Sequence, residues 1–157
     1  MYPFVDFKTY NATNPFGAYD PKFYPITKHH IGSDFGVPEV TPIHAPEDGE
    51  LLKAVYNPAR GNTGIYCFTH GGITWGLELC HLKELPKTGK FKRGDVIAFS
   101  GNTGSATTRP HLHAVMHRDC AVTKNYTELV NEAAFFRLRD AGRLVDPYAW
   151  FSAHLLA

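Results

Sequence analysis

The sequence predicts a mainly β protein in which an antiparallel β-sheet forms a groove and one helical insertion lies near the C-terminus. Short segments rich in β-branched and aromatic residues follow one another between residues 49 and 99, which is typical of antiparallel strands. Turn residues separate these segments, above all the Gly71-Gly72 pair, which suits a hairpin. Residues 125–141 instead have the apolar spacing of a helix.

The whole chain, residues 1–157, is expected to form a single domain. Its length suits one hydrophobic core, and it has no internal repeat, low-complexity tract or linker that would divide it. Residues 1–29 are rich in Tyr, Phe, Pro and Asn without a sustained period. We expect them to wrap around the domain as turns and short strands, ordered by their aromatic side chains.

The strands are expected in a definite order along the chain. The pattern predicts them at residues 51–56, 65–70, 73–82, 96–99 and 111–117. The last one begins directly after Pro110, because a first strand position tolerates the missing backbone donor.

The helix predicted at residues 125–141 belongs to an insertion that covers about residues 124–142. Asn125 and Glu128 have a spacing that resembles a capping box, and Gly142 is placed to end the helix. We expect this helix to pack on the sheet.

Composition excludes several classes of protein. The 16 basic and 15 acidic residues nearly cancel, and this balance argues against a nucleic-acid partner. No run of residues suits membrane insertion, and the N-terminus lacks the pattern of a secretory signal. Cys67, Cys80 and Cys120 are an odd number without a Cys-x-x-Cys pair, so we expect free, buried thiols.

Nine histidines are more than packing or solubility requires, and they raise the question of a metal. His111 and His113 flank Leu112 on a predicted strand, where side chains alternate between faces, so both imidazoles should point the same way about 7 Å apart. One can bind a metal while the other reaches a bound water molecule. Chance alone would give roughly half an occurrence of this pattern, so the pair by itself is weak support.

A second candidate metal pair is His30 and Asp34. Imidazole and carboxylate both bind zinc, but Gly32 and Pro38 argue against a helix here. The two side chains must therefore converge through a turn, for which Gly32 supplies backbone freedom, because an extended chain would hold them roughly 13 Å apart.

Together these segments offer three protein ligands for one metal. Three ligands leave the fourth tetrahedral position for water, as a catalytic zinc site requires. His81, at the end of the predicted strand 73–82, provides a further imidazole that can act with His111 around the bound water.

Four segments, in this order, resemble the lysostaphin-type (LytM-like) peptidoglycan endopeptidases: HHIGSDF, LELCHL, GNTGSATTRPHLH and RLVDPYAWF. The resemblance covers about residues 14–151. It implies the lysostaphin-type peptidase fold, with zinc held by His30, Asp34 and His113, and with His81 and His111 acting in catalysis. The helical insertion departs from the family pattern and puts the substrate preference in doubt.

The implied activity is zinc-dependent hydrolysis of peptide bonds in the stem or cross-link peptides of bacterial peptidoglycan. Zinc would activate water near neutral pH, and His81 and His111 would handle its proton and stabilise the oxyanion. The sequence leaves open which of them is the general base and which bond is cut. We expect a monomer of the kind encoded by phages as endolysins, held in the host cytoplasm until release at lysis, or carried on a virion.

Two other functions compete with this interpretation. One is a non-catalytic wall-binding or activator module that keeps the fold, and the other is a phage tail-tip protein with a mainly structural role. The remaining histidines are interpreted as ordinary surface or strand residues: His29, His44, His70, His117 and His154.

Overall fold

The computed structural model describes residues 1–155, so the last two residues of the predicted domain lie outside the described part of the chain. Its main sheet has the strand order β1-β2-β9-β6-β5-β4-β7, with β10 also paired to β9, and all of these pairs are antiparallel. The strands of this sheet are β1 (Ala12–Asn14), β2 (Ser33–Phe35), β4 (Gly49–Asn57), β5 (Gly61–His70), β6 (Ile73–Leu82), β7 (Gly89–Phe91), β9 (Leu112–Arg118) and β10 (Leu144–Val145). A second, two-stranded sheet joins β3 (Pro42–His44) to β8 (Val96–Phe99).

The predicted mainly β, antiparallel class is confirmed, and so is each predicted strand. The segments predicted at 73–82 and 96–99 match β6 and β8, whereas β4 and β5 extend further than predicted and β9 is displaced by one residue. Gly71 and Gly72 form the β5–β6 hairpin turn, and both have positive φ.

The two faces of the central strands have different roles. Along β9, Ala114 and Met116 belong to the main hydrophobic core, whereas Val115, on the other face, packs in a second cluster with residues from the insertion. This division follows from the two-residue repeat of side chains along a strand. The metal-ligand candidate His113 shares a face with Val115, so the site and the insertion lie on the same side of the sheet.

The N-terminal segment is ordered by aromatic side chains, as predicted. Phe4 is fully buried, and its ring lies 5.4 Å from that of Phe35 and 4.6 Å from that of Phe151. Edge-on aromatic contacts of this kind add to the gain from apolar burial. The first residues of the chain are thus packed against β2 and the last helix.

The prediction of one helix at 125–141 was wrong, because the insertion contains two helices and a third follows. These are α1 (Val122–Glu128), α2 (Glu132–Asp140) and α3 (Pro147–Leu155). Asn131 separates α1 from α2. Its backbone is extended, and its side chain accepts a hydrogen bond from the Ala134 amide, so it begins a new helix. Gly142 lies just past the end of α2 with positive φ, in agreement with the prediction.

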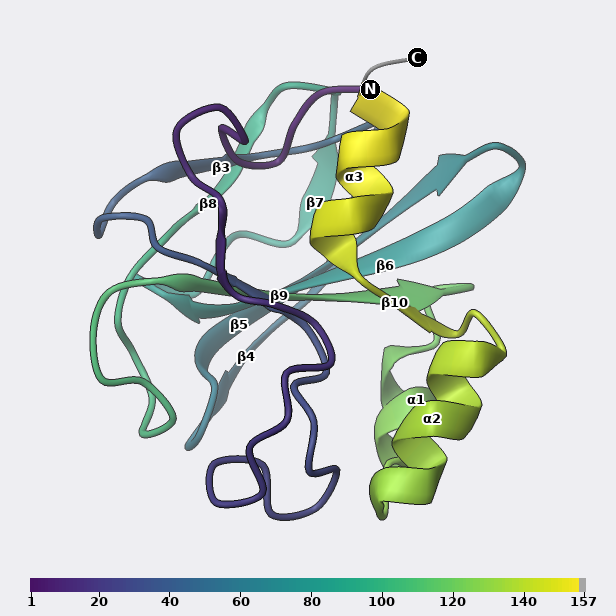
Figure 1. Cartoon of the computed structure of the whole chain (residues 1–157). Coiled ribbons are helices and arrows are strands. Elements are labelled where there is room, and N and C mark those ends of the chain that lie inside the picture. The colour runs from purple at the N-terminus through teal and green to yellow at the C-terminus, as the bar shows by residue number, and fades with distance from the viewer. Residues whose placement is uncertain (156–157) are drawn as a thin grey trace.

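Helix α3 was missed although the sequence contains its start signal. Asp146 accepts a hydrogen bond from the Tyr148 amide at 2.9 Å, and Pro147 occupies the first helical position. Figure 1 shows α1 and α2 together beside β10, with α3 separate from them near the N-terminus. No helix within residues 1–155 has the length and apolarity that a membrane crossing requires.

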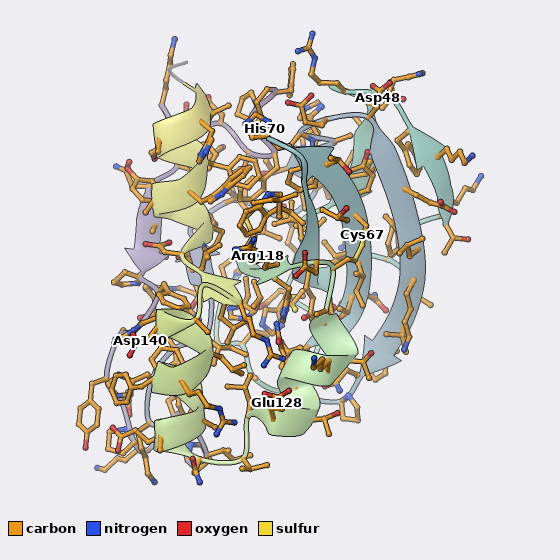
Figure 2. All side chains as sticks on the ribbon, turned by 90° about the vertical axis from the view of Figure 1, so that its right-hand side faces the viewer. Asp48, Cys67, His70, Arg118, Glu128 and Asp140 are labelled. Carbon is orange, nitrogen blue, oxygen red and sulfur yellow. A yellow bond between two sulfur atoms is a disulfide. The ribbon has the colours of Figure 1, made fainter. Side chains whose placement is uncertain are left out.

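The expectation of three free thiols was wrong for two of them. Cys67 on β5 and Cys120 after β9 form a disulfide, and Cys80 stays free and buried. Gly76 on β6 stands opposite Cys67, and a Cβ there would lie 3.1 Å from the Cys120 sulfur, so the absence of a side chain makes room for the bridge. Figure 2 shows the strand that carries Cys67 close to α1.

Candidate metal centre and active site

Three potential metal ligands meet where β2 pairs with β9. Asp34 and His113 are directly opposite each other in this pairing, and His30 precedes β2. His113 Nδ1 lies 2.8 Å from Asp34 Oδ1 and 3.0 Å from His30 Nε2, which is itself 3.3 Å from the same carboxylate oxygen. The structure therefore brings together the three residues that the sequence selects as metal ligands.

Gly32 has a different role from the one predicted. It is not among the residues with positive φ, but a Cβ at this position would clash with the backbone carbonyl of Ala114 on β9. Glycine is thus required for the close approach of the two chains, and that approach places Asp34 beside His113.

The hydrogen bonds around His30 fix which of its nitrogens faces the cluster. His30 Nδ1 lies 3.2 Å from the carbonyl oxygen of Pro15, which only accepts, so this nitrogen carries the proton. Nε2 is then the nitrogen that faces Asp34 and His113, and its lone pair is the one that can bind a metal. Metal-binding histidines are usually oriented in this way by an outer hydrogen bond.

The electrostatics of the cluster also suit a cation. Burial favours a higher pKa for Asp34, but the adjacent His113 and His30 imidazoles outweigh it and hold the pKa well below the usual range. Burial lowers the pKa of His113. Two imidazoles and one carboxylate form a donor set that matches zinc with one position left open.

His81 and His111 lie beside these three residues. Their rings are 4.6 Å apart, and His111 Nε2 is 3.7 Å from Asp34 Oδ1. His81 Nδ1 donates to the Thr103 carbonyl at 2.8 Å, and His111 Nδ1 is 3.0 Å from the Arg109 carbonyl. Each ring therefore keeps Nε2 as a proton acceptor. Burial lowers the pKa of His81 to about 4, so it is neutral at pH 7.

All five residues line one cleft of about 800 Å³. Its other walls come from four places: the N-terminal segment, with Asn14 and Tyr24, residues 36–38 after β2, the loop at residues 106–110, and the pair Arg60 and Tyr126. A cleft open to solvent, with polar groups at its base, is the usual form of a site for a small or extended substrate.

The family model described as Peptidase family M23 matches residues 28–126, which include all five histidine and aspartate positions of the site. The chain belongs to this family.

Two curated relatives and two solved structures show how this M23 chain relates to known proteins. It is 33% identical to an uncharacterized metalloprotease of Haemophilus influenzae over 79% of this chain and 29% of that protein. It is 40% identical to the peptidoglycan DD-endopeptidase ShyA of Vibrio cholerae over 60% of this chain and 23% of that protein. The chain thus spans less than a third of either relative.

The solved structures support the predicted lysostaphin-type fold. A zinc-containing peptidase from Vibrio cholerae superposes with a TM-score of 0.61 at 30% identity, covering 76% of this chain and 36% of that one. The catalytic domain of lysostaphin from Staphylococcus simulans gives 0.58 at 25% identity, covering 71% and 83%.

The structure adds residues to the M23 site that sequence reasoning did not select. Asn14 lies 3.2 Å from the second oxygen of Asp34 and 2.6 Å from the hydroxyl of Tyr24, whose ring stacks on His30. Burial raises the pKa of Tyr24 to about 12, so the hydroxyl keeps its proton. No local pattern identifies these residues, because the contacts form only when the N-terminal segment folds over β2.

The histidine next to the cluster has a separate environment. His29 Nε2 pairs with Glu132 on α2 at 2.9 Å, and its Nδ1 lies 2.9 Å from the Gly17 carbonyl. It therefore does not join His30 in the cluster. His117 is a strand residue, as predicted, but it is fully buried beside Glu78.

Proposed function

We propose that this protein is a zinc-dependent endopeptidase that hydrolyses peptide bonds in the stem or cross-link peptides of bacterial peptidoglycan. The observation that carries the proposal is the convergence of His30, Asp34 and His113 at the base of a cleft that also contains His81 and His111, each with its Nδ1 facing a backbone carbonyl. The relatives named peptidoglycan DD-endopeptidases support the choice of substrate.

In this proposal His30, Asp34 and His113 hold the zinc ion. A bound zinc ion supplies Lewis acidity, which polarises a carbonyl and lowers the pKa of a water molecule from about 16 towards about 7. The outer contacts from Pro15 and Asn14 keep the ligand side chains oriented before the metal arrives.

His81 and His111 are proposed to move protons. Each has its Nδ1 held by a backbone carbonyl, so Nε2 is available to take a proton from the attacking water and to return it to the leaving amine. In the protonated form either ring can also stabilise the oxyanion of the tetrahedral intermediate. Help of this kind typically contributes 10²- to 10⁴-fold to the rate.

The test compares zinc content and wall clearing among variants. We expect the wild type to bind one zinc ion and to reduce the turbidity of purified, outer-membrane-stripped Gram-negative cell walls. His113→Ala should lose both properties, because it removes a ligand, whereas His81→Ala should keep zinc and lose activity. His154→Ala, on α3 outside the cleft, is the matched control and should behave as the wild type.

If the wild type binds no zinc, or if His113→Ala and His81→Ala clear walls as fast as it does, the peptidase proposal is wrong. The non-catalytic wall-binding module then becomes the better explanation. The monomeric state, the phage origin and the route of release to the wall stay predictions from the sequence.

A further inference from the structure

An arginine projects into the cleft next to the proposed catalytic histidine. Arg60 lies in the turn between β4 and β5, and its backbone carbonyl accepts a hydrogen bond from the His81 amide at 2.7 Å. Its side chain lines the same cleft as His81 and His111. Arg60 thus contacts His81 through its backbone and also forms part of the cleft wall.

The Arg60 side chain is held from two directions. Nη1 donates to Glu78 Oε1 on β6 at 2.6 Å, and the guanidinium carbon lies 4.5 Å from the centre of the Tyr126 ring on α1. Glu78 is buried, with 1% of its side chain exposed, whereas Arg60 is 31% exposed. The inner end of the guanidinium is therefore fixed by a buried carboxylate, and part of the group remains accessible.

The accessible part still has donors to offer. Within residues 1–155, Nη1 is the only Arg60 side-chain nitrogen with a recorded hydrogen bond, so Nε and Nη2 have none. A guanidinium presents its donors in a rigid plane that matches both oxygens of a carboxylate. Arg60 is thus oriented in advance for an anionic group that enters the cleft.

Arg109, the second arginine of the cleft, differs from Arg60 in that no other side chain among residues 1–155 holds it in place. Arg109 also lines the cleft, but within the described residues its side chain has no recorded hydrogen bond or ion pair. It acts as an unanchored charge, whose ordering on binding costs side-chain entropy. Arg60 has already lost most of that freedom, because Glu78 and Tyr126 restrain it.

We propose that Arg60, supported by Glu78 and Tyr126, binds a carboxylate of the peptide substrate and makes the enzyme prefer stem peptides with a free carboxylate over peptides in which that group is amidated. This inference rests on the proposed peptidase function. It assigns to the helical insertion, through Tyr126, a share in substrate selection.

The experiment measures kcat/KM for two synthetic cross-linked stem-peptide dimers, identical except that the carboxylates beside the scissile bond are free in one and amidated in the other. We expect the wild type to prefer the free form by about 10- to 100-fold, the range for a hydrogen bond to a charged group. In Arg60→Gln the preference should fall to near one, mainly through KM, with unchanged zinc content. Arg60→Lys should restore part of it.

The control separates substrate contact from support of α1. Arg143 Nη1 lies 2.8 Å from Oε2 of Glu128, which is on α1, but Arg143 does not line the cleft. Arg143→Gln should lower the melting temperature and keep the substrate preference. An equal loss of preference in Arg109→Gln would show a general effect of cleft charge and would contradict the role of Arg60.

Folding defects are controlled by a second variant. Arg60→Gln combined with Glu78→Gln removes both charges of the buried pair, and this double change should give a folded protein that does not distinguish the two substrates. If the zinc-loaded wild type cleaves both dimers equally, or if Arg60→Gln keeps the preference, this inference fails and the peptidase function stands. If the wild type cleaves neither, the proposed function itself fails.

Discussion

Two clusters of histidine and carboxylate side chains lie on the same face of the main sheet. One contains Asp34 and His113 at the open cleft, and the other contains Glu78 and His117 beneath α1. His113 and His117 are four residues apart on β9, so the two-residue repeat of a strand directs both to one face. The same residue types therefore occur in two neighbouring environments.

The difference between the clusters is the partner of each carboxylate. Glu78 has an arginine within 2.6 Å, and Asn125 contacts His117 Nδ1 at 3.0 Å, so α1 closes this cluster. Asp34 has imidazole nitrogens and the Asn14 amide around it, and it faces the cleft. A carboxylate already neutralised by arginine has little to offer a metal, whereas a carboxylate that faces imidazole nitrogens in an open cleft can share a metal ion with them.

The largest expected effect comes from neutralising each carboxylate in turn. Asp34→Asn should abolish zinc binding, because it removes the anionic ligand. Glu78→Gln should keep zinc but lower the free energy of unfolding by about 3 kcal/mol, because Arg60 loses its buried partner. Zinc analysis and urea unfolding of both variants check the contrast, and zinc loss in Glu78→Gln would remove the distinction between the clusters.

The charge of Glu78 also predicts how the stability of Glu78→Gln depends on pH. Burial favours a higher pKa for Glu78, but His117 and Arg60 outweigh it, so the pKa lies below its ordinary value of 4.5. Its ionised form therefore stabilises the fold above about pH 4.5, and this stability is lost as the pH falls further. Glu78→Gln should unfold with a weaker dependence on pH in that acidic range.

An effect on stability alone is expected from the disulfide that joins β5 to the segment before α1. Cys67 and Cys120 are 53 residues apart, and replacing both by alanine should cost about 2–4 kcal/mol because the unfolded chain regains freedom. The melting temperature should fall by roughly 5–15 °C. Dithiothreitol should lower it in the wild type and leave the double variant unchanged. Equal melting temperatures of all samples would show that the bridge has no stabilising role.

The smallest effect concerns the start of α2. Asn131→Ala removes the side-chain acceptor for the Ala134 amide and should cost about 1 kcal/mol of stability. Asn131→Asp keeps an acceptor and serves as the control. Because α2 pairs through Glu132 with His29 and not with the neighbouring ligand His30, zinc content should not change in either variant, and a loss of zinc would show that the insertion supports the metal site directly.

The sequence alone determined the central strands and the five histidine and aspartate residues of the candidate site. The strand at 73–82 and the turn at Gly71-Gly72 follow from patterns within about ten residues, and the strand repeat already placed His111 and His113 on one face. Helix ends did not follow from the apolar spacing, because Asn131 and Pro147 begin new helices inside or after a stretch that has suitable spacing throughout.

The tertiary structure decided which distant residues meet. His30 and His113 are 83 positions apart, and Arg60, Glu78 and Tyr126 come from a turn, a strand and a helix. The Cys67–Cys120 bridge likewise depends on the strand register that places Gly76 between Cys67 and Cys120. Such contacts are set by strand pairing and packing across the whole chain, and no short stretch of sequence contains the information that specifies them.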